Sequence, residues 1–100
     1  MTYRSKLKSE DTELLFDAIL SLKTKEDCYR FFEDVSTITE LKALSQRFHI
    51  AKLLSEGVTY QEIERLTKAS TTTISRVGRC LNYGADGYRN VIKKLYPAKK

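Results

Sequence analysis

Residues 59–82 read TYQEIERLTKASTTTISRVGRCLN, and this stretch decides the fold that the sequence predicts. Thr59 and Glu62 have the spacing of a capping box, in which the threonine hydroxyl accepts from the Glu62 amide and the carboxylate reaches back. Ser70 is a good N-cap for a second helix. Only three or four residues, around 67–69, separate the two helices, and so short a connection predicts a helix-turn-helix at about residues 59–82. The side chains expected to face inward from it are Ile63, Leu66, Ile74, Val77 and Leu81.

Helical periodicity also dominates the sequence before this stretch. We expect a first helix at about residues 10–22, with Leu14, Leu15, Ala18, Ile19 and Leu22 on one face. A second is expected from about Lys25 to Val35, burying Cys28, Phe31, Phe32 and Val35. A longer third helix carries Leu41, Leu44, Phe48, Ala51 and Leu54 at helical spacing. Thr37 can cap its start, with Glu40 three residues on, and Gly57 closes its end.

A last helix is expected to bury Tyr88, Val91, Ile92 and Leu95 before Pro97. No stretch alternates polar and apolar residues as a half-buried strand would. The predicted fold class is therefore all-α, with six helices, and the length of 100 residues suits one domain spanning residues 1–100.

Positive charge is concentrated in the second half of the chain. Residues 1–56 hold nine basic and ten acidic side chains, whereas residues 57–100 hold nine basic and three acidic ones. A one-sided basic surface is typical of nucleic-acid binding, because it attracts polyanions. A solvated lysine and arginine surface without a partner gives the same pattern, so charge alone leaves both readings open.

The two cysteines, Cys28 and Cys80, match no metal spacing, and nothing marks the chain as secreted. The N-terminus has no apolar stretch long enough for a signal peptide, and no run approaches a membrane span. We expect a cytoplasmic protein with reduced thiols, no membrane association and no metal.

The start of the second helix of the motif has the side chains that duplex DNA requires. In a helix-turn-helix this end enters the major groove, where short hydrogen-bonding side chains let the backbone approach base edges. Hydroxyl groups can bond to base edges or phosphates, a threonine methyl can touch the thymine methyl, and nearby basic side chains favour phosphate. The predicted DNA-binding residues are Tyr60, Gln61, Lys68, Ser70, Thr71, Thr72, Thr73, Ser75, Arg76 and Arg79. Of these, Thr71, Thr72 and Ser75 are expected to choose the base sequence, and Lys68 and Arg79 to hold phosphates.

The same residues also have simpler explanations that do not involve DNA. A threonine cluster at a helix start can serve only to cap the helix, and Arg76 and Arg79 can be ordinary solvated charges. The general pattern also prefers a small residue where Glu64 stands and a glycine where Lys68 stands. Capping, short turn, core spacing, hydroxyl-rich front and basic flanks nevertheless agree with one another.

The stretch from Ala43 through Gly57 and on to Arg76, reading ALSQRFHIAKLLSEG and then TYQEIERLTKASTTTISR, resembles the Trp repressor family. The whole chain is more closely similar to the small Trp-repressor-like proteins of the YerC/YecD type, which are bacterial. Resemblance to the repressor itself covers about residues 36–96 and is most specific from Leu44 to Leu81. It implies an intertwined homodimer of six-helix chains that presents two reading helices to successive major grooves.

The resemblance also implies an effector pocket. Two arginines that sandwich the indole of the corepressor tryptophan in the family align with Arg47 and Arg76, and a pocket threonine aligns with Thr37. A family glycine is replaced by Val77, and Asp34 and Ser36 replace leucines, so we expect tryptophan not to be the effector. Either a different small anion or amino acid binds there, or the two arginines pair with carboxylates or phosphates. The DNA-reading positions Thr71 and Thr72 replace apolar residues, so the family's target sequence does not carry over.

The predicted function is a sequence-specific regulator of transcription that binds double-stranded DNA, acts as a repressor and forms a homodimer. Phe16, Phe31, Phe32 and Phe48 add more apolar surface than 100 residues easily cover alone, which favours the dimer. The alternatives are an RNA-binding module, which usually carries stacking aromatics on a platform, and a helical dimer that only binds proteins. An enzyme has least support, because the lone His49 has no nucleophile or metal set beside it.

Overall fold

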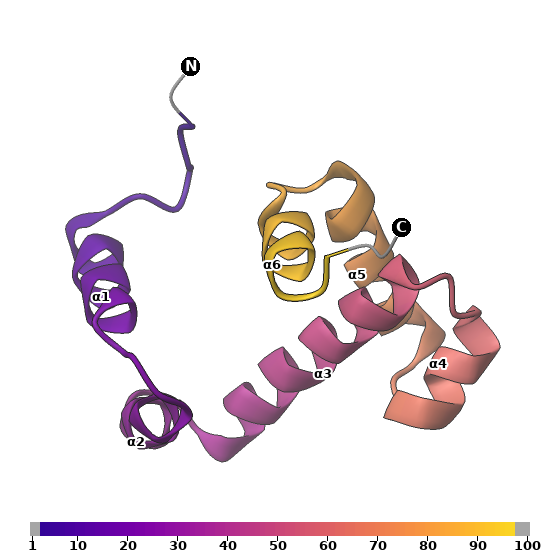
Figure 1. Cartoon of the computed structure of the whole chain (residues 1–100), viewed down its shortest axis with the longest axis horizontal. Helices are drawn as coiled ribbons and strands as arrows, with labels where there is room; N and C mark the ends of the chain where they lie inside the picture. Colours follow the sequence, from indigo (N-terminus) through magenta and orange to yellow (C-terminus); the bar gives the residue numbers. More distant parts are fainter. Residues whose placement is uncertain (1–2, 98–100) are drawn as a thin grey trace. The chain divides into compact units, whose positions relative to one another are not determined.

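The computed structural model describes residues 3–97, which form six α-helices and, within that range, no β-strand (Figure 1). This confirms the predicted all-α, six-helix fold class. The described residues fall into two compact units, divided between Ile38 and Thr39. Within residues 3–97, none of the helices has the length and apolar character needed to cross a membrane.

The first unit contains α1 (Glu10–Leu20) and α2 (Lys25–Val35). The Thr24 hydroxyl accepts from the amide of Asp27 at 3.0 Å, and the Asp27 carboxylate accepts from the Thr24 amide at 3.3 Å, so a reciprocal capping box starts α2. Helix α1 ends at Leu20, two residues before the expected position, where the Ser21 and Leu22 amides donate to the carbonyls three residues earlier. The Ser21 hydroxyl also donates to the Ala18 carbonyl, at 2.6 Å.

Neither helix of the first unit has a buried side chain. Phe31 and Phe32 are half-buried and meet edge to face with their centroids 5.4 Å apart, whereas Cys28 is exposed and Val35 is 51% exposed. The expected burial of Cys28 and Val35 is therefore wrong for the single chain. Two helices of eleven residues each leave part of their apolar surface uncovered within the unit.

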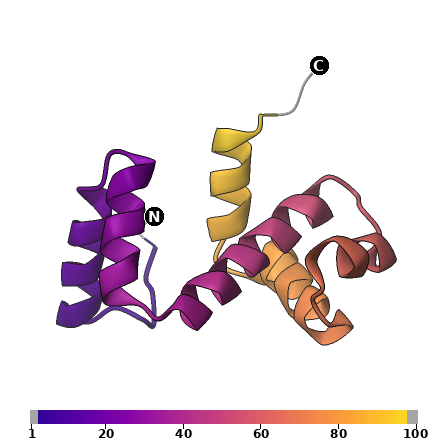
Figure 2. The same cartoon turned by 90° about the horizontal axis from the view of Figure 1, so that it is seen from below.

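The second unit contains α3 (Ile38–Ser55, which begins at the boundary), α4 (Tyr60–Thr67), α5 (Thr71–Tyr83) and α6 (Gly87–Leu95) (Figure 2). Helix α5 packs against both α4 and α6. As expected, the chain turns after α3 at Gly57, whose φ of +82° belongs to the left-handed region that glycine adopts without a steric penalty.

The core of the second unit rests on three isoleucines with no exposed surface. Ile50 comes from α3, Ile63 from α4 and Ile74 from α5. The side chains packed with them are Ala51, Leu53, Ala69, Val77, Leu81 and Ile92. The predicted inward positions on α5 are thus confirmed.

Several apolar side chains expected to face inward are exposed in the single chain. Leu66 on α4 is 44% exposed, and Val91 and Leu95 on α6 are 45% and 57% exposed. Helix α3 also buries a face that periodicity missed, since Ile50 and Leu53 are buried while Leu44 of the expected stripe is 49% exposed. Helices α4 and α6 each pack one face against the core, and these apolar side chains lie on faces that the second unit leaves exposed.

Gly84 and Gly87 form a matched pair for testing the connection between α5 and α6. A Cβ at Gly84 would lie 2.3 Å from the carbonyl oxygen of Cys80, whereas one at Gly87 would meet nothing within 4 Å. We expect Gly84→Ala to lower the free energy of unfolding by about 1–3 kcal/mol, because the backbone must shift. Gly87→Ala should raise it by about 0.4–1 kcal/mol by reducing the entropy of the unfolded chain. Urea unfolding followed by circular dichroism measures both, and equal effects of the two substitutions would contradict this account.

Candidate nucleic-acid interface

The hydroxyl-rich start of α5 divides its side chains between capping and solvent. The Ser70 hydroxyl accepts from the Thr73 amide at 3.1 Å and lies 3.1 Å from the Thr73 hydroxyl. Ser70 and Thr73 are therefore used within the protein as a cap, as the plainer reading of the cluster expected. Thr71, Thr72 and Ser75 are exposed and make no such bond in the described part of the chain.

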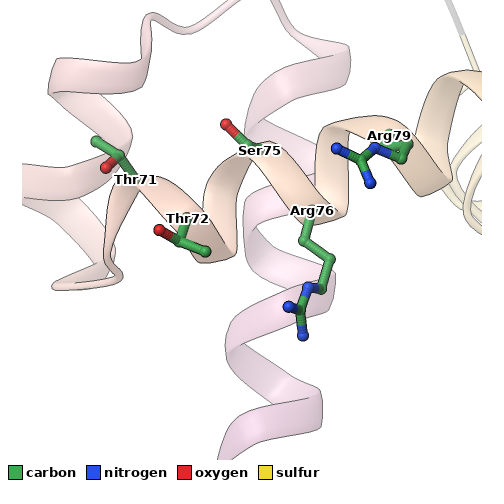
Figure 3. A pocket seen from close by; sticks show the side chains of 5 residues that line it. All are labelled: Thr71, Thr72, Ser75, Arg76 and Arg79. Carbon is green, nitrogen blue, oxygen red and sulfur yellow. The ribbon is translucent and has the colours of Figure 1, made fainter.

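The exposed side chains of α5 surround a cavity of about 300 Å³ (Figure 3). Figure 3 shows the three hydroxyl side chains nearer the start of the helix and the two guanidinium groups further along it. The lining consists of Thr71, Thr72, Ser75, Arg76 and Arg79. The structure thus brings together five of the ten residues predicted to bind DNA.

This surface is positively charged and contains no carboxylate. The lining has two arginines and no acidic side chain, and the first turn of α5 has no acidic residue either. Within residues 3–97, Arg76 and Arg79 take part in no ion pair. The start of a helix adds a partial positive charge, so the hollow favours an anion whose oxygens can accept hydrogen bonds.

Lys68 lies in the turn between α4 and α5, exposed and in the left-handed conformation, with φ of 62°. This is the position where the general pattern prefers glycine, and the backbone explains the preference because an L-residue is strained there. Ala69, the next residue, is 6% exposed and packs into the core.

The start of α4 differs from the prediction in its polar contacts. The Thr59 hydroxyl accepts from the Glu62 amide at 3.3 Å, as expected for the cap. The Glu62 carboxylate, however, accepts from the Arg65 guanidinium, and this hydrogen bond lowers the pKa of Glu62 and raises that of Arg65. The expected reciprocal half of the capping box is therefore wrong, because the arginine one turn on takes the carboxylate.

Tyr60 and Gln61, the predicted contacts at the start of α4, are both exposed. The Tyr60 hydroxyl turns toward α5, where it would lie 3.2 Å from a Cβ at Gly78. The glycine thus permits close approach of the tyrosine hydroxyl to the second helix of the motif.

A second cavity of about 300 Å³ lies on another side of α5. Its lining includes Arg47 from α3 together with Arg76 and Val77 from α5, three of the four residues predicted for an effector pocket. Thr37, the fourth, belongs to the first unit, so its part in the pocket stays a prediction. Arg76 lines both cavities and so lies between the two candidate sites.

Sequence reasoning missed three side chains of the second cavity, namely Thr73, Cys80 and Tyr88. Helical spacing could have found two of them, because positions 73, 76, 77 and 80 share one face of a helix. Tyr88 was expected in the core; it packs against Phe48 with the ring centroids 6.4 Å apart. Burial is the main cause that raises the pKa of its phenol, although the nearby Arg47 charge acts in the opposite direction.

Within residues 3–97, no group of three or more histidine, cysteine, aspartate or glutamate side chains could hold a metal ion. Cys28 and Cys80 are both free and exposed.

The family model for the Trp repressor protein matches residues 10–96. The chain is 52% identical over 90 residues to the uncharacterized protein YerC of Bacillus subtilis, covering 90% of this chain and 86% of that one. Among solved structures, it is similar to a TrpR-like protein from Eubacterium eligens, with 56% identity and a TM-score of 0.89 over 95% of this chain and 98% of the other. A candidate Trp repressor from Staphylococcus aureus has 43% identity and a TM-score of 0.88 over 95% of each chain. With its six helices and the match over almost its whole length, the chain belongs to the Trp repressor family.

Proposed function

We propose that this protein is a sequence-specific regulator of transcription, acting as a repressor, that binds double-stranded DNA through the start of α5. The observation that carries the proposal is the cavity in which exposed hydroxyl groups adjoin two arginines without acidic partners. Membership of a family of DNA-binding regulators supports it. We assign base reading to Thr71, Thr72 and Ser75, because they are the exposed hydroxyls of this surface.

We further propose that the working form is a homodimer. Large apolar side chains of the first unit stay exposed in one chain, including Leu14 at 68% and Leu20 at 82%. Exposed apolar area of this kind is typical of an association surface. A dimer would also present two copies of α5, which read half-sites about one DNA turn apart.

The first prediction separates base reading from phosphate contact. A duplex selected from a random library serves as the target, and gel shifts compete it against unrelated duplex, single strands and RNA. Thr72→Ala should change base preference at one or two positions and cost about 1–3 kcal/mol on the selected duplex. Lys68→Ala should weaken all duplexes alike and reduce the salt slope by about one.

Two controls accompany these variants. Lys94→Ala removes the same charge from an exposed position on α6 and should leave the salt slope unchanged. Lys68→Gly removes the charge while relieving the left-handed strain, so it should stabilise the fold yet weaken binding as Lys68→Ala does. Altered preference in Lys68→Ala with none in Thr72→Ala would reverse the assignment, and preference for RNA over duplex would overturn the proposed function.

The second prediction concerns the dimer. Sedimentation equilibrium at micromolar concentration should give twice the 11.5 kDa mass of the chain. Leu14→Glu should shift the mass toward one chain while the helical circular dichroism remains, since this side chain is already exposed within a single chain. A wild-type protein that sediments as a monomer would contradict the proposal.

The third prediction concerns the cavity between Arg47 and Arg76. We propose that it takes a small anion or an amino acid other than tryptophan, because Val77, only 3% exposed, stands where the family's tryptophan binder has glycine. Calorimetry with L-tryptophan should show no saturable binding tighter than about 100 µM. Val77→Ala should bind tryptophan more tightly than the wild type, because it removes two methyl groups from the lining of the cavity. Tight binding by the wild type that also strengthens DNA binding would show that valine does not exclude the indole.

A further inference from the structure

The connection between α4 and α5 is held by hydrogen bonds centred on Thr67, the last residue of α4. Its hydroxyl donates to the Ile63 carbonyl at 2.8 Å and accepts from the Ala69 amide at 3.2 Å. Lys68 between them is left-handed, and Ser70 already caps α5. A displacement of Thr67 would therefore also displace Ser70, the N-cap of α5, which is only three residues further along the chain.

One side chain from another helix also reaches this connection. The Gln46 side-chain amide, on α3, donates to the Thr67 main-chain carbonyl at 3.0 Å across a separation of 21 residues. This side-chain hydrogen bond joins α3 to the segment that contains α4, the turn and α5. Gln46 and Thr67 are both half-buried, so loss of the amide would remove the protein donor from a partly covered carbonyl.

The core and this hydrogen bond constrain α5 in different ways. The contact among Ile50, Ile63 and Ile74 holds the helices together, but hydrophobic attraction has no preferred direction. A hydrogen bond does depend on direction, and the last carbonyls of a helix lack partners within it. Gln46 supplies such a partner at the point where the chain turns toward the exposed hydroxyls of α5.

We infer that Gln46 is a positioning residue that sets the turn and, through it, the orientation of the start of α5 for discrimination between DNA sequences. Its use in DNA reading rests on the proposed function, whereas its hold on the turn does not. Discrimination is the sensitive quantity, because base contacts need accurate placement while phosphate attraction tolerates small displacements. Gln46 itself need not touch DNA.

The test uses Gln46→Met, which keeps the length of the side chain but removes the donor, and Gln46→Asn, which keeps the amide but shortens its reach. Both leave the charge of the protein unchanged. The affinity ratio between the selected duplex and an unrelated duplex should fall about three- to tenfold, the range expected for one hydrogen bond. Affinity for the unrelated duplex and its salt slope should stay as in the wild type. Amide hydrogen exchange at Ala69 in the free protein should become faster.

Arg89→Lys is the matched control at the other end of α5. Arg89 on α6 donates from Nε to the Leu81 carbonyl at 2.7 Å, and lysine keeps the charge while losing the guanidinium geometry. This variant should leave both Ala69 exchange and discrimination unchanged. Wild-type discrimination and exchange in both Gln46 variants would overturn the inference. So would an equal loss in Arg89→Lys at matched stability, because the effect would then follow from stability alone.

The two proposals can fail separately. If the wild type shows no preference among duplexes, the proposed DNA reading fails, and Ala69 exchange in the Gln46 variants still decides the role in the turn. Faster exchange there supports the hold of Gln46 on the turn, and unchanged exchange overturns it. If the wild type discriminates and only the Gln46 variants lose that ability, both proposals are supported.

Discussion

The contact among Ile50, Ile63 and Ile74 is the constraint on which the second unit depends. Each isoleucine comes from a different helix and none has exposed surface. Because one face of α5 is committed to this contact, its opposite face must carry the polar and basic side chains outward. Gly78 allows the Tyr60 hydroxyl to lie against α5. The exposed cavity at Thr72 and Arg76 is thus a consequence of what α5 buries.

Polar side chains add directional hydrogen bonds at the start of α5, which apolar contacts do not provide. Ser70 and Thr73 use their oxygens for the cap, which leaves Thr71 and Thr72 available to a ligand. Lys68 has a strained left-handed backbone and carries a positive charge in the turn. Arg76 borders both cavities, so the two candidate sites share one side chain. Helix α5 therefore lines both cavities, on two faces that meet at Arg76.

The two units differ in how many of their apolar side chains are buried. The second has a buried core drawn from four helices, whereas the first has no buried side chain in either helix. Two exposed side chains of the first unit, Leu14 and Leu15, belong to the apolar stripe that periodicity predicted for α1. The apolar pattern is present as predicted, but neither α1 nor α2 has a buried side chain. That difference is what makes association the natural proposal for this protein.

The sequence alone determined the helices, most of their ends and the inward face of α5, because caps, turns and helical spacing act over three or four residues. It also indicated the hydroxyl-rich, basic front at Thr72 and Arg76. Only the tertiary structure decided which faces are covered and that Cys80 and Tyr88 share a cavity with Arg47. The bond from Gln46 to Thr67 joins positions 21 residues apart, and no local pattern records such a pairing. Such a pairing depends on how α3 packs against the turn, and contacts that depend on packing cannot be read before the packing is known.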